Sequence, residues 1–116
     1  MTKFFVLYRM PIAGLEAWMQ IDPEKRKADE DAMKVSWNAW MASHTAQIKE
    51  TAGAGKTKLV TSDGVSDSKN DIMLYSMVEA ESHEAAAKLF ENHPHLQIPG
   101  ATIEVMTINV LPGAAA

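Results

Sequence analysis

Residues 71–111, DIMLYSMVEAESHEAAAKLFENHPHLQIPGATIEVMTINVL, decide the fold. The first ten of them are rich in strand formers and lack glycine and proline, which predicts a β-strand. Ser82 is placed to cap a helix, because its hydroxyl can accept a hydrogen bond from a free N–H of the first turn. Pro94 cannot continue that helix, so a turn is expected at 92–100. Residues 101–111 alternate between two faces and complete a strand–helix–strand unit.

The chain before this unit supplies a second one. Residues 3–10 (KFFVLYRM) alternate and predict a strand, whereas 12–20 fit either a short helical turn or a loop. Asp22–Pro23–Glu24 combines a capping aspartate, a proline at the first helical position and an early acid, so a helix is expected to begin there. Spacings of three and four predict that it continues to about Thr51 with one apolar face, formed by Met33, Trp37, Trp40, Met41, His44 and Ile48.

Shorter segments join the two units. The glycines at 53 and 55 are expected to stop the long helix. Residues 56–61 predict a short strand, 62–64 a turn and 65–70 a polar loop. The order of elements is then strand, helix, strand, strand, helix, strand. It predicts an α+β, ferredoxin-like βαββαβ fold, with a four-stranded antiparallel sheet and two helices on one face.

Composition limits the classes of function. The 116 residues are expected to form a single domain over 1–111, with a frayed tail at 112–116. The net charge is −4, and the one dense basic cluster, 25–27, is followed by acids, which argues against nucleic acid as a partner. The chain has no cysteine, no run of membrane-spanning length and no signal-peptide core, so we expect a cytoplasmic protein.

The predicted strands are apolar on both faces. In the third strand, Leu74 and Val78 lie on one face, whereas Tyr75 and Met77 lie on the other. Two helices can cover only one face of a sheet, so the second face needs a partner. We therefore expect a homodimer in which two copies pack sheet against sheet.

The chain resembles the YCII-related (DGPF-domain) family of small α+β proteins. The matching residues are Leu7–Tyr8–Arg9, Asp63–Gly64 with Lys69, 78–82 (VEAES), Glu84–Ala85, Pro94–His95–Leu96, Pro99–Gly100 and Ile103–Glu104–Val105. The resemblance implies a ferredoxin-like fold and assembly as a dimeric α+β barrel. The chain departs from the family after Asp63–Gly64, where Val65–Ser66 replaces the usual Pro–Phe and the loop before Lys69 is one residue shorter.

His44 is the best candidate for a catalytic residue. Its imidazole titrates near neutral pH, and Asp63 is the carboxylate we expect to orient it. The spacing of His44, Ile48 and Gly55 resembles the YCII branch of the family, in which a helix histidine is suspected of acid–base chemistry with an acidic partner. The alternative is a structural histidine that is bonded to a backbone carbonyl.

A second set of residues is expected to line a ligand site. Polar side chains on a sheet face inside a dimer must be paired or must line a cavity, and large aromatic side chains can enclose a small molecule. The candidates are Arg9, Trp37, Trp40, Tyr75, His95 and Glu104. The alternatives are cross-strand ion pairs for the charged residues, core packing for the tryptophans, and a turn beside the Asp63 loop for His95.

The sequence predicts no metal and no cofactor. His93–Pro94–His95 with His83 resembles a ligand set, but no carboxylate lies at a recognised ligand spacing. The 53–57 stretch (GAGKT) imitates a phosphate loop, yet position 50 is Glu50 and the stretch follows a helix and enters a strand, which is the reverse of the required order. We therefore expect a homodimer that binds a small organic molecule, with acid–base chemistry at His44 and Asp63. The alternative is a non-catalytic binding or interaction module.

Overall fold

A computed structural model describes residues 1–113, so the predicted tail at 112–116 lies partly outside the described residues. The elements, in chain order, are β1 (Thr2–Arg9), α1 (Ile12–Met19), α2 (Pro23–Ser43), β2 (Ile48–Gly53), β3 (Thr57–Thr61), β4 (Gly64–Ser68), β5 (Ile72–Ala80), α3 (His83–Lys88), the 3-10 helix η1 (Pro94–Gln97) and β6 (Thr102–Thr107). In the described residues, no helix is long and apolar enough to cross a bilayer.

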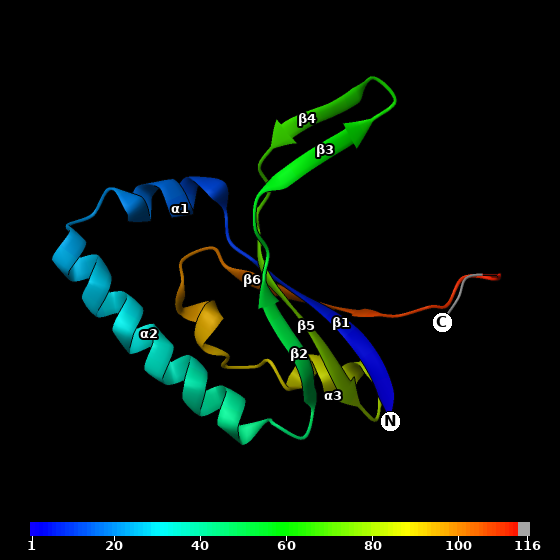
Figure 1. The fold of residues 1–116 in the computed structure, drawn as a ribbon. Helices are drawn as coiled ribbons and strands as arrows, with labels where there is room; N and C mark the ends of the chain where they lie inside the picture. The colour runs from blue at the N-terminus through cyan, green and yellow to red at the C-terminus, as the bar shows by residue number, and fades with distance from the viewer. Residues whose placement is uncertain (114–116) are drawn as a thin grey trace.

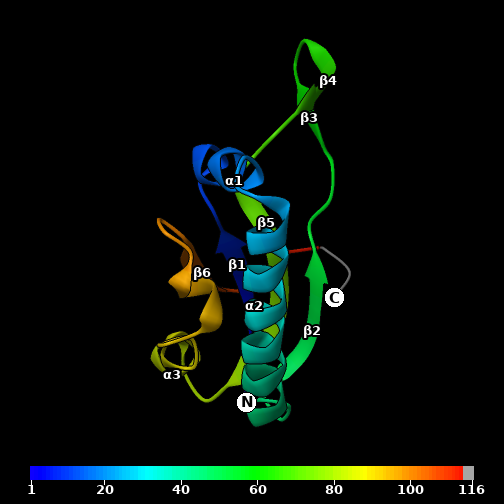
Figure 2. The ribbon, with the colours of Figure 1, turned by 90° about the vertical axis from the view of Figure 1, so that its left-hand side faces the viewer.

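The main sheet has four antiparallel strands in the order β2-β5-β1-β6 (Figure 1). The first strand in the chain is central, and it pairs with β5 on one side and with β6 on the other. This is the ferredoxin-like order, and α2 and α3 lie on the same face of the sheet (Figure 2). The predicted fold class is confirmed.

The core lies between this face and the helices. Phe4, Val6 and Tyr8 of β1 are buried there beside Val78 of β5, as the alternation predicts. Phe90 and Ala86 cover them from the side of α3, and the two helix tryptophans pack against the cluster from α2. The Tyr8 hydroxyl reaches Ser76 Oγ at 2.8 Å, and Ser76 Oγ in turn reaches Thr51 Oγ1 at 2.7 Å, so these three hydroxyl groups satisfy one another.

Helix starts follow the sequence in most respects. Ser82 accepts a hydrogen bond from the backbone N–H of Ala85 at 3.1 Å, which confirms the predicted cap. Pro23 and Glu24 occupy the first turn of α2 as expected, but Asp22 makes no side-chain capping bond. The open choice at 12–20 resolves as a helix, in which the N–H of Leu15 bonds the carbonyl of Pro11.

The long helix ends at Ser43, and the prediction that it continues to Thr51 is wrong. Residues 48–53 instead form β2, which pairs with β5 and brings Thr51 against Ser76. Serine and threonine at 43 and 45 are weak helix formers, and the ladder to β5 outweighs the remaining helical periodicity. Ile48 therefore reaches the core from a strand.

The prediction that residues 56–61 form the second strand of the main sheet, followed by a polar loop at 65–70, is wrong, because these residues form a separate hairpin. β3 and β4 pair only with each other, and they project beyond the main sheet (Figure 1). The turn at Ser62–Asp63 lies within the predicted turn at 62–64, and Gly64, which begins β4, has a φ of 130°, which favours glycine. At the other end of the chain, β6 stops at Thr107, short of the predicted 111.

The second face of the sheet is exposed to solvent. Its centre is apolar, and the rings of Phe5 and Tyr75 lie 6.0 Å apart across β1 and β5. The outer sheet face consists of Phe5, Leu7, Tyr75, Met77 and Met106, with charged residues at its margins. This pattern agrees with the alternation read from the sequence.

Candidate functional site

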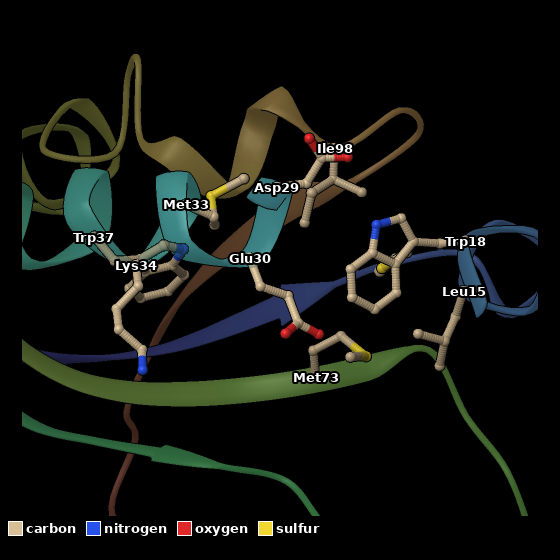
Figure 3. A pocket seen from close by; sticks show the side chains of 10 residues that line it. Leu15, Trp18, Asp29, Glu30, Met33, Lys34, Trp37, Met73 and Ile98 are labelled. Atoms are coloured by element: carbon tan, nitrogen blue, oxygen red, sulfur yellow. The ribbon is translucent and has the colours of Figure 1, made fainter. Parts of the chain in front are cut away.

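An apolar cavity lies between α1, α2 and β5 (Figure 3). It has a volume of about 420 Å³, within the range of small-molecule sites. Its apolar wall consists of Met10, Leu15, Trp18, Met33, Trp37, Met73 and Ile98. Asp29, Glu30 and Lys34 supply the polar groups, and all three come from α2.

Helical spacing places most of this wall. Leu15 and Trp18 are three apart on α1, and Met33 and Trp37 are four apart on α2, so each pair points in one direction. Figure 3 shows the Trp18 ring of α1 extending toward Glu30 of α2, with Met73 of β5 below Glu30. The sequence analysis selected Trp37 but missed the α1 residues, because the state of 12–20 was left open. The spacing of Leu15, Trp18 and Met19 was the signal that could have revealed them.

A buried histidine stands behind the cavity wall. His93 is 1% exposed, and its ring lies 4.4 Å from both Trp37 and Trp40. Its Nδ1 accepts a hydrogen bond from the backbone N–H of His95 at 3.0 Å, so the neutral ring carries its proton on Nε2. Among the described residues Nε2 has no hydrogen-bond partner. The plane of the His93 ring lies at 82° to that of Trp37, an edge-to-face arrangement that aromatic pairs favour.

Burial changes the pKa of two groups in this cluster. It lowers the pKa of His93 to about 4, with smaller contributions from His95 and His44. It also raises the pKa of Tyr8 to about 12, against a weaker opposing effect of the bond to Ser76. Both side chains are therefore neutral at pH 7.

His95 is a structural anchor in this arrangement. It is buried, its Nε2 donates to the carbonyl of Arg9 at 2.8 Å, and burial lowers its pKa. The alternative interpretation placed His95 beside the Asp63 loop. In the structure it packs instead beside the end of β1. The described residues contain no group of three side chains suited to hold a metal ion.

Three other ligand-lining candidates lie on the opposite side of the sheet, away from the cavity. Arg9 holds Asp71 through two bonds, Nε at 2.9 Å and Nη2 at 2.7 Å, and reaches Glu104 at 2.6 Å. The Arg9 guanidinium lowers the pKa of Asp71 through these bonds. The hydroxyl of Tyr75 donates to Glu50 at 3.4 Å. The charged residues thus form cross-strand ion pairs, and sequence analysis missed Asp71 as the main partner.

The structure does not bring His44 and Asp63 together within one chain. His44 caps the end of α2, where its Nδ1 donates to the carbonyl of Trp40 at 2.7 Å and its ring stacks on the indole of Trp40 at 4.1 Å. Its Nε2 is left for other partners. Asp63 is exposed at the turn of the hairpin, which extends from the opposite end of the sheet (Figure 1). Trp40 lines the open cleft beside His44 and not the main cavity.

Comparison with known proteins gives a fold relationship. No family model matches the sequence, and no curated protein matches it. Among solved structures, the chain is similar to 5-chloro-2-hydroxyhydroquinone dehydrochlorinase (TftG) from Burkholderia phenoliruptrix AC1100, in complex with 2,5-dihydroxybenzoquinone. The TM-score is 0.52 at 15% identity, over 89% of this chain and 91% of that one. Likeness at this identity shows the α+β fold.

Proposed function

We propose that this protein belongs to the YCII-related group and binds a small, largely apolar organic molecule in the cavity between α1, α2 and β5. The single observation that carries the proposal is the chemistry of the cavity wall. Two indole rings and three methionines surround a volume of about 420 Å³, and the polar groups come from one helix. Apolar walls with few polar groups are typical of ligand sites, because burial drives binding while the polar groups orient the ligand.

The ligand is expected to be flat and aromatic. The faces of Trp18 and Trp37 can stack on a planar ring, and methionine sulfur makes favourable contacts with ring edges. TftG was solved with a quinone, a planar six-membered ring, which makes planar ring compounds the first class to test. Whether the bound molecule is then transformed is a separate question; the alternative to an enzyme is a non-catalytic binding module.

The binding proposal predicts that filling the cavity abolishes binding. Titration of the wild type with 2-naphthamide, a neutral planar probe, is expected to show binding by calorimetry. Leu15→Trp adds a third indole ring, which occupies the space of the ligand. The affinity for 2-naphthamide is therefore expected to fall at least about tenfold. Leu59→Trp, the same change on the exposed hairpin, is the matched control and is expected to bind as the wild type does.

Binding of equal strength to the wild type and to Leu15→Trp would place the ligand elsewhere. Absence of binding to the wild type by any of a set of planar aromatic probes would overturn the proposal. Thermal melting of both variants separates loss of the site from loss of the fold.

We also propose that the protein is a homodimer through the outer sheet face. The described chain exposes 8124 Å² of surface, compared with about 6,200 Å² for a compact monomer of this mass. Its radius of gyration is 16.4 Å, compared with about 13 Å for a compact domain of this length. The excess area is similar to what a chain buries in a stable homodimer, and the apolar outer sheet face is the surface available for it.

We propose that acid–base chemistry at His44 and Asp63 would require the homodimer. Because the two residues are far apart in one chain, Asp63 can orient His44 only across the dimer, from the projecting hairpin of the second copy. The observation in favour is the geometry of His44: its Nδ1–H is held by the carbonyl of Trp40, which leaves Nε2 as a proton acceptor toward an open cleft.

Disulfide trapping tests this arrangement directly, because the native sequence has no cysteine. His44→Cys/Asp63→Cys is expected to form a covalent dimer on oxidation, since a disulfide needs Cα atoms within about 7 Å and the proposed arrangement brings the two positions together across the interface. The two single variants, His44→Cys and Asp63→Cys, control for random cross-linking. If the double variant cross-links no better than the single ones, Asp63 does not serve as the partner of His44.

A further inference from the structure

A second cleft opens beside the main cavity. It has a volume of about 530 Å³ and lies between α1 and the base of the β3–β4 hairpin. Leu15 and Met73 line both spaces, so the cavity and the cleft share a wall. A molecule bound between the indole rings therefore has a route past these two side chains to the base of the hairpin.

The cleft differs from the cavity in charge. Lys56, Lys58 and Lys69 line it, in a chain whose net charge is −4. Lys58 is neutralised by its ion pair with Asp67, which lies opposite it in the hairpin ladder. Lys56 and Lys69 have no carboxylate within ion-pair distance in the described part of the chain, and Glu16 of α1 is the one other acid along the cleft.

The base of the hairpin is held in place by Asn70. Its amide donates to Thr57 Oγ1 at 3.2 Å, and its carbonyl oxygen accepts from the backbone N–H of Ile72 at 3.0 Å. These bonds tie the start of β3 to the start of β5, so the neighbouring Lys56 and Lys69 are anchored close to the shared wall. The β3–β4 hairpin does not pair with the main sheet, so these bonds fix its position at the end that carries the two lysines.

We propose that the natural ligand is an amphipathic anion: an aromatic or similarly apolar body in the cavity, with a carboxylate or comparable anionic group between Lys56 and Lys69. This inference rests on the proposed function and specifies its ligand class. The apolar body gains from burial, and the anionic group gains from two lysines that lack a carboxylate partner. Asp29 and Glu30 of α2 also line the cavity, so the charged end of the ligand is repelled from α2.

Two probes that differ only in charge test the inference. 2-Naphthoate and 2-naphthamide have the same ring system and nearly the same shape, but only the first is an anion. The wild type is expected to bind naphthoate about three- to tenfold more tightly than naphthamide, the gain that two partly exposed ion pairs provide. This preference is expected to fall as salt is added, whereas binding of the amide stays constant.

Paired variants assign the preference to the cleft. Lys56→Gln/Lys69→Gln is expected to bind the two probes equally, with the affinity for naphthamide unchanged. Lys49→Gln/Lys88→Gln removes the same two charges from other elements and is expected to keep the preference. Equal binding of both probes by the wild type, or a preference that survives in Lys56→Gln/Lys69→Gln, would overturn the inference while leaving the cavity proposal intact. Failure of both probes to bind the wild type would overturn both.

Discussion

Leu7→Lys/Met77→Lys is expected to convert the proposed homodimer into a folded monomer. The two side chains lie on neighbouring strands in the middle of the outer sheet face, and they are diagonal to each other, so the new charges do not stand directly opposite within one chain. In a homodimer the same face meets itself, so each dimer would bury four ammonium groups. A cost of only about 1 kcal/mol for each raises the dissociation constant about a thousandfold.

The measurement is sedimentation with light scattering over micromolar concentrations, with circular dichroism to verify the fold. Met19→Lys/Val35→Lys adds the same charge at exposed apolar positions on α1 and α2, and it is expected to remain a dimer. A wild type that sediments as a well-folded monomer at these concentrations would contradict the proposal. So would a Leu7→Lys/Met77→Lys protein with the mass of the wild-type dimer.

The parts of the fold that could be predicted are those in which local signals and tertiary demands agree. β1 alternates between buried and partly buried residues from Phe4 onward, and β5 does so from Ser76 to Ala80. The cap at Ser82 is a short-range hydrogen bond that needs no other element. The end of α2 was missed because Trp40, His44 and Ile48 keep helical spacing across a boundary that is set by pairing with β5. The periodicity of a short stretch does not reveal a strand partner 25 residues away.

The candidate site shows the same limit. Trp37 is recognisable from its helix face, but the cavity also needs Leu15, Trp18 and Met73, which come from two other elements. Likewise, the sequence identifies Arg9 and Glu104 as strand residues that need partners, whereas Asp71 meets Arg9 only because β1 and β5 run antiparallel. His93 carries no sequence signal of its burial, since a histidine beside a proline most often lies in an exposed turn.

His93 is expected to make the protein lose stability steeply as the pH falls below neutral. Its pKa is about 4 in the fold, compared with 6.5 as the ordinary value. Above pH 6.5 the ring is neutral in both folded and unfolded chains, so it gives no pH dependence. Between pH 6.5 and 4 the unfolded chain binds a proton that the folded one does not, so the free energy of unfolding falls with decreasing pH. By pH 5 the loss reaches about 2 kcal/mol.

The structure explains why the folded ring resists protonation. A second proton would have to enter at Nδ1, which already accepts the N–H of His95, so charging the ring also removes the cap of η1. His95 contributes in the same direction because burial lowers its pKa too. Asp71 acts at lower pH: its pKa is depressed, so its contribution is lost as the pH falls through the acidic range below 4. The interval from pH 7.5 to 5 therefore reports mainly on the histidines.

His93→Asn separates the titration from the packing. Asparagine keeps a short acceptor for the N–H of His95 and is a favoured cap, but it does not titrate. In urea unfolding at pH 7.5 the variant is expected to be less stable by about 2–3 kcal/mol, because the aromatic pocket is underfilled. Its stability should then change less between pH 7.5 and 5, so the two proteins approach each other at pH 5. His83→Asn, which replaces the exposed histidine of α3, is the control. Its free energy of unfolding should change with pH as that of the wild type does. Parallel pH profiles for wild type and His93→Asn would show that the buried ring accepts its proton without opening the core.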